Sequence, residues 1–104
     1  MRQFCVYRNL NAATRAVYPL LLNVQSDLIS ETGTRVVVPM MRADRGMPAM
    51  PPLVPTVPVK GKAHVLVTPL LAGAELADLG ALEADLSEDR GTIMAALDLL
   101  ISGI

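Results

Sequence analysis

Residues that could carry catalysis or hold a metal are few in this sequence. His64 is the only histidine, and it lies in an apolar alternating segment where a structural side chain is expected more often than a base. Cys5 is the only cysteine, and its place in a predicted strand favours a buried, inert thiol. One Cys and one His exclude most structural zinc sites. Motifs of hydrolases, P-loop proteins and dinucleotide-binding enzymes are absent from the sequence. The residues therefore predict a protein that is not an enzyme, with no catalytic site, no metal and no cofactor.

Charged residues form three groups that could contact ligands. The acidic group surrounds the start of the last predicted helix, where it suits the helix dipole better than a metal site; it consists of Glu83, Asp85, Glu88 and Asp89. Two arginine groups have the chemistry to contact phosphate or carboxylate; they are Arg2, Arg8 and Arg15, and Arg42 and Arg45. Because 9 basic and 10 acidic residues give a net charge of −1, we interpret the charge as dispersed. We expect no direct binding of nucleic acid.

Length and composition indicate one small domain over residues 1–104. Hydrophobic residues make up 52% of the chain but aromatic residues only 3%, so the core must be aliphatic. A single cysteine suits a reducing, cytoplasmic compartment. The longest apolar run near the start is far shorter than the ~20 residues of a membrane span, so we expect no membrane contact.

Short β-rich segments with turn residues between them predict a small barrel or sandwich. The predicted strands are residues 3–7, 17–25, 35–39, 54–59 and 63–68, with the third ending at Pro39. Lys60-Gly61-Lys62 predicts a hairpin turn. Five prolines exclude a helix from residues 40–58, which are expected to be irregular; the spacing of three of them also fits a polyproline II ligand.

The last third of the chain has helical character. Composition predicts a helix over residues 73–86, interrupted by Gly80, and then a second helix over residues 88–101 with Ser87 as its N-cap. The second helix carries an apolar stripe that continues to the end of the chain; its members are Ile93, Leu97, Leu100, Ile101 and Ile104. An apolar terminus needs a covering surface, in its own protomer, in a twin or in another protein.

Several segments in register resemble the CcdB family, the toxins of toxin–antitoxin pairs that poison DNA gyrase. The resemblance is strongest in the sequence LNVQSDLI at residues 22–29 and continues in RVVVP at residues 35–39 and ADLS at residues 84–87. Gln3-Phe4, Val6-Tyr7 and the terminal Gly103-Ile104 also match. The resemblance implies a mainly β fold with a C-terminal α-helix, an SH3-like small barrel of the CcdB/MazF toxin type. It further implies that residues 73–86 are partly extended.

The resemblance also implies partners and contact residues. The expected assembly is a homodimer that binds the GyrA subunit of DNA gyrase without catalysis, traps its cleavage complex, and is displaced by a CcdA-like antitoxin with a disordered tail. The positions that match or replace gyrase contacts of the family are Gln3, Phe4, Tyr7, Ser26, Leu28, Ile29, Asp98, Ile101, Ser102, Gly103 and Ile104. The family carries an aromatic pair that includes a tryptophan where this chain has Ile101 and Ser102, and Asn where it has Asp98.

The sequence therefore leaves three alternative functions open. The first is a gyrase-poisoning toxin, and the second is a non-toxic homologue that keeps antitoxin binding but has lost the aromatic pair. The third is a MazF-like endoribonuclease, for which Asp27, Arg35 and His64 are the nominal catalytic candidates.

Overall fold

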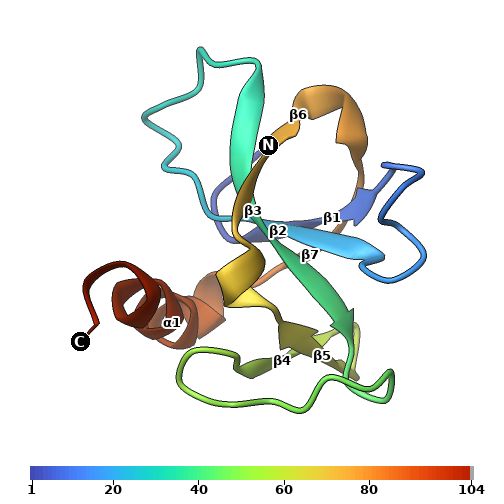
Figure 1. Cartoon of the computed structure of the whole chain (residues 1–104). Helices are drawn as coiled ribbons and strands as arrows, with labels where there is room; N and C mark the ends of the chain where they lie inside the picture. The colour runs from blue at the N-terminus through green and yellow to red at the C-terminus, as the bar shows by residue number, and fades with distance from the viewer. Residues whose placement is uncertain (104) are drawn as a thin grey trace.

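The computed structural model describes residues 1–103 and consists of seven β-strands followed by one α-helix (Figure 1). This confirms the expected mainly β fold with a C-terminal helix. Short 3₁₀ turns connect the later elements. The bounds are β1 Cys5–Asn9, β2 Leu20–Asn23, β3 Thr34–Arg42, β4 Thr56–Val59, β5 Lys62–Leu66, β6 Ala72–Glu75, β7 Leu79–Asp85 and α1 Arg90–Ser102.

The strands form one antiparallel sheet in the order β4-β5-β3-β2-β1-β7. Strand β3 is long enough to pair with β6 along its first half and with β5 along its second half. The sheet curls into an open half-barrel, and α1 lies against one end of it (Figure 1). The half-barrel agrees with the small-barrel expectation.

The prediction that Pro39 ends the third strand is wrong, because β3 continues to Arg42. Pro39 pairs with Leu21 of β2, and its carbonyl accepts a hydrogen bond from the Val67 N–H at 2.9 Å on the opposite side. A strand residue directs its nitrogen and its oxygen to the same side. The nitrogen of Pro39 therefore faces the place where the partner of β3 changes from β6 to β5, and no ladder bond is lost.

The helix predicted over residues 73–86 is also wrong. This segment forms β6, a 3₁₀ turn at Leu76–Asp78 and β7, as the family resemblance implied. Alanine, leucine and glutamate favour a helix in isolation, but propensity amounts to tenths of a kcal/mol per residue. Pairing of β6 with β3 and of β7 with β1 satisfies the backbone instead.

Other strand boundaries move by a few residues. The first strand starts two residues later than predicted, after Phe4, whose backbone φ is +65°. The second is confined to Leu20–Asn23, and the edge strand and the fifth strand are shortened to β4 and β5. The predicted hairpin is confirmed: Lys60 and Gly61 have φ of +51° and +78°, the pair of positive values that a tight hairpin turn needs.

The core is mainly aliphatic, as composition predicted, with Phe4 and Tyr7 as its buried aromatic members. Its main cluster fills the space between the sheet and α1, and the residues exposed by 1% or less include Val6, Leu22, Val38, Met40, Leu66 and Ile93. Cys5 is 1% exposed, so the expected burial of its thiol is confirmed.

Helix α1 begins at Arg90, after a 3₁₀ turn at Ser87–Asp89. Ser87 does not cap it, contrary to the prediction, because its hydroxyl donates to the Asp85 carboxylate, which also accepts the Ser87 N–H at 2.9 Å. Ile93 and Ala96 are the buried residues of α1. Within residues 1–103, no helix has the length and apolarity that crossing a membrane requires.

Candidate docking surface

The loop between β2 and β3 presents two apolar side chains to solvent. Leu28 is 91% exposed and Ile29 is 53% exposed. Both belong to the segment that carries the strongest family resemblance. Exposed apolar side chains on a loop of fixed shape are typical of a surface that binds another protein.

Polar side chains hold this loop in place on its inner side. The Asp27 carboxylate accepts the Gln3 N–H at 2.8 Å, which ties the loop to the N-terminal segment. The Ser26 hydroxyl accepts the Leu28 N–H at 3.2 Å, and the Ser26 carbonyl accepts the Ile29 N–H at 3.0 Å. The backbone that carries Leu28 and Ile29 is therefore fixed by its own hydrogen bonds.

Two further side chains join the loop to the sheet. The Gln25 amide accepts the Val36 N–H at 3.0 Å and donates to the Ile29 carbonyl. The Arg35 guanidinium, on a residue only 8% exposed, donates to two loop carbonyls and to the first carbonyl of β3; these belong to Ser30 at 3.3 Å, Thr32 at 3.0 Å and Thr34 at 2.8 Å. Sequence reasoning missed this role of Gln25, although its place in the family-like segment was a signal.

The C-terminal end of α1 forms a second exposed patch. Ile101 is 74% exposed, and Asp98, Ser102 and Gly103 are also exposed. Gly103 ends the helix in a left-handed conformation at φ +75°, with its N–H donating to the Leu99 carbonyl at 3.0 Å. The apolar stripe therefore divides: its first residue, Ile93, is buried, and Ile101 faces solvent. The predicted contact Ile104 lies outside the described residues.

The predicted contact residues thus fall into a group at the β2–β3 loop, a group at the end of α1, and two buried residues. Gln3, Ser26, Leu28 and Ile29 lie together at the β2–β3 loop, and the helix-end residues lie together at the terminus. Figure 1 shows the loop and the end of α1 on the same side of the view, at different heights. Phe4 and Tyr7 are only 4% and 7% exposed and pack in two core clusters, so in this chain they belong to neither exposed patch.

The nominal endoribonuclease residues are not assembled into one site. The polar atoms of Asp27 and Arg35 are engaged in the hydrogen bonds that hold the β2–β3 loop. His64 lines a cavity to which neither of them contributes. A base, an acid and a cation that share no cavity cannot act on one phosphodiester.

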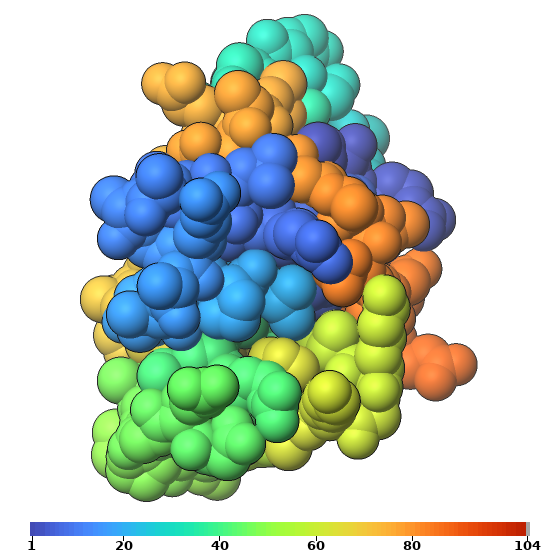
Figure 2. Space-filling model, turned by 90° about the vertical axis from the view of Figure 1, so that its right-hand side faces the viewer, coloured from blue at the N-terminus to red at the C-terminus, as the bar shows by residue number. Residues whose placement is uncertain are grey.

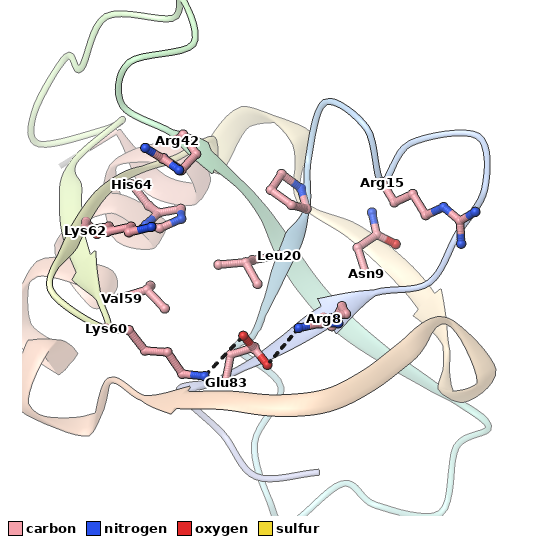
Figure 3. Close-up of a pocket in the computed structure, with 11 residues that line it drawn as sticks. Arg8, Asn9, Arg15, Leu20, Arg42, Val59, Lys60, Lys62, His64 and Glu83 are labelled. Atoms are coloured by element: carbon pink, nitrogen blue, oxygen red, sulfur yellow. Dashed lines mark hydrogen bonds and ion pairs between the residues drawn. The ribbon is translucent and has the colours of Figure 1, made fainter.

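The cavity beside His64 gathers cations from four segments (Figure 3). Its volume is about 530 Å³. Its basic lining residues are Arg8, Arg15, Arg42, Lys60 and Lys62, and its only carboxylate among the lining residues is Glu83. Figure 2 shows the β1–β2 segment in blue, with the yellow-green tip of the β4–β5 hairpin reaching toward the orange β7. Arg8, Arg15 and Arg42 of the two arginine groups line this cavity, whereas Arg2 and Arg45 do not.

Two titratable groups near the N-terminal segment have shifted pKa values. Burial raises the pKa of the Tyr7 phenol above its usual 10.0, although its oxygen accepts the Arg2 N–H at 2.8 Å. The hydroxyl and the N–H of Ser87 lower the pKa of Asp85 below its usual 3.8 by donating to the carboxylate. Both shifts follow from structural hydrogen bonds and burial, and neither group is poised for proton transfer near neutral pH.

A search of curated proteins found no match. The model of the family described as CcdB protein matches residues 3–103. Because this match covers nearly all of the 104 residues, the chain belongs to the CcdB family, the toxins of toxin–antitoxin systems.

Proposed function

We propose that this protein is a toxin that binds the GyrA subunit of DNA gyrase and traps its cleavage complex, without catalysing a reaction itself. The observation that carries the proposal is the exposure of apolar side chains at two places of fixed backbone, Leu28 and Ile29 on the β2–β3 loop and Ile101 at the end of α1. Within a CcdB-family chain, such patches are suited to docking on a larger protein.

The proposed assembly is a cytoplasmic homodimer. A two-fold dimer presents each patch twice, so two modest contacts act together on a symmetric target and gain avidity. A CcdA-like antitoxin would compete by folding a disordered tail onto the same toxin, at the cost of ordering that tail.

A second candidate function rests on the helix end. Ile101 and Ser102 occupy the place of an aromatic pair in the family resemblance, and the chain has no tryptophan. Interface energy concentrates in such aromatic residues. The alternative is a homologue that binds an antitoxin but no longer poisons gyrase.

The test is direct binding to purified GyrA together with a plasmid cleavage assay. The toxin proposal predicts capture of GyrA and accumulation of linear, protein-linked plasmid DNA. Absence of binding at concentrations on the order of tens of micromolar would defeat it. If antitoxin binding is retained at the same time, the second candidate is supported.

A further inference from the structure

The first residues of the chain are tied to the β2–β3 loop. The Gln3 N–H donates to the Asp27 carboxylate at 2.8 Å, and the Gln3 side chain donates to the Val24 carbonyl at 3.1 Å. The Phe4 N–H donates to the carbonyl of Asn23, the last residue of β2, at 2.7 Å. These three hydrogen bonds hold residues 3–4 against the loop that carries the first exposed patch.

The same residues also contact the start of α1. The Phe4 carbonyl accepts the Leu86 N–H at 2.7 Å, and Leu86 directly precedes the 3₁₀ turn that leads into the helix. The Arg90 guanidinium lies 5.5 Å from the centroid of the Phe4 ring, within the range of a cation–π contact. Phe4 has a backbone φ of +65°, which a bulky residue adopts only where its surroundings impose it. Phe4 therefore joins the loop to the helix.

Arg90 stands where a cation is electrostatically unfavourable. It is the first residue of α1, at the end where the helix dipole disfavours positive charge. Within residues 1–103 its side chain forms no ion pair, although Glu88 and Asp89 are close in sequence. The contact with the Phe4 ring is therefore the interaction that accounts for a cation at this end of the helix.

A contact at the start of α1 controls the place of its far end. The helix has 13 residues and is therefore about 18 Å long. Its buried residues are Ile93 and Ala96, and no residue from 97 to 103 is buried, so the core holds the second half less firmly. A tilt of about 10° at Arg90 would move Ile101 by about 3 Å.

We infer that Arg90 is a positioning residue for the docking surface. Through the Phe4 ring it sets the angle of α1 against residues 3–4, and thereby the spacing between Ile101 and Leu28. The inference rests on the proposed docking on GyrA and deepens it, because Arg90 acts on that docking through the helix angle. A partner that contacts both exposed patches binds only conformers with the right spacing, so a loosened helix lowers the apparent affinity by the fraction of competent conformers lost.

The test is calorimetric titration of full-length variants against purified GyrA. R90M keeps an aliphatic side chain over the ring but removes the cation, and it should weaken binding by about two- to fivefold. R90K restores a cation and should bind within about 1.5-fold of the unmodified chain. R45M is the matched control: it removes an exposed arginine from the β3–β4 loop and should leave the affinity unchanged. Arg90 and Arg45 are both exposed, so these variants should retain the fold.

A double-mutant cycle assigns the effect to the ring. Phe4→Leu keeps an apolar side chain in the core but removes the aromatic face, so R90M should cause no further loss in this background. An equal loss from R90M with and without the ring would overturn the inference. So would a loss in R45M as large as the loss in R90M.

Residual dipolar couplings of the α1 amides give a readout that is independent of GyrA. Measured against the couplings of the sheet, they should change in R90M and return in R90K. Unchanged couplings in R90M would overturn the inference, and so would changed couplings with full GyrA affinity. If the unmodified chain does not bind GyrA, the proposed function fails, and the couplings still decide whether Arg90 sets the angle of α1.

Discussion

Replacing Leu28 by alanine separates binding from folding more cleanly than any other single change. Leu28 is 91% exposed in the free chain, so the substitution removes almost no buried contact. The expected change in unfolding free energy is less than about 0.5 kcal/mol. Any loss of function then belongs to the surface and not to stability.

The expected effect on binding follows from the area that Leu28 can bury. Because nearly all of the side chain is available, burial against a partner would contribute about 1.5–3 kcal/mol. Its removal should weaken binding to GyrA by about 10- to 150-fold. The polar network beneath the loop stays intact, so the loss comes from contact and not from disorder of the backbone.

The assay is calorimetric titration against purified GyrA, with thermal unfolding of each variant measured in parallel. Leu82→Ala is the matched control, since Leu82 is 54% exposed but lies on β7, outside both patches. Unchanged affinity in Leu28→Ala, or an equal loss in Leu82→Ala, would refute the assignment of the β2–β3 loop as the docking surface.

Three further changes test the parts that hold the molecule together. Arg35→Met removes the donors to the carbonyls of Ser30, Thr32 and Thr34 and should lower the unfolding free energy by about 1–3 kcal/mol, measured by urea unfolding. Ser87→Ala should raise the pKa of Asp85 toward 3.8, because the hydroxyl donor is removed, and NMR titration of the carboxyl would measure the change. The folded-state pKa of Asp85 is depressed, so in the unmodified protein this carboxylate stabilises the fold above pH 3.8. The stabilisation is lost as the pH falls through the folded-state pKa. Gly80→Ala would place a methyl group 2.9 Å from the Leu10 side chain and 3.2 Å from the Arg8 carbonyl oxygen. The free energy of unfolding should therefore fall by about 1–2 kcal/mol, which thermal unfolding would detect as a lower melting temperature.

Local signals in the sequence predicted local structure well. The turn at Lys60-Gly61 was predictable because two adjacent positive φ angles are a property of the turn itself. Residues 73–86 were not predictable from composition, because their strands depend on partners in β1 and β3. The effect of Pro39 on its strand was wrongly predicted for the same reason, since a proline ends a strand or not depending on which neighbouring strand its nitrogen faces.

The candidate sites show the same division. The exposed pair Leu28 and Ile29 lies within one contiguous segment, so a family resemblance could point to it. The cavity beside His64 is lined by Arg8, Arg42 and Lys62 from three strands, and only the curling of the sheet places them around one cavity. Formal net charge carries no information about such convergence.

The helix end permits a prediction in the opposite direction, a gain of binding. Ile101 is 74% exposed and Ser102 is exposed, so Ile101→Phe with Ser102→Trp disturbs no core contact. The change loses one hydrogen bond, from the Ser102 hydroxyl to the Asp98 carbonyl at 2.7 Å, which is worth about 1 kcal/mol. An aromatic anchor at an interface centre contributes about 2–4 kcal/mol.

The double variant should therefore bind GyrA at least about 25-fold more tightly than the unmodified chain, because the anchor adds about 2 kcal/mol or more to binding, whereas the lost hydrogen bond lies within the helix and lowers only the folding stability. Gly103 caps the helix through its backbone, so the aromatic rings would be carried on an end of fixed shape and little ordering entropy would be lost on binding. Ala95→Trp places a tryptophan on an exposed position of the same helix, away from its end, and controls for added surface apolarity. If both variants gain equally, the gain is non-specific; if neither gains, the end of α1 is not a docking element, and Leu28 and Ile29 must carry the contact alone.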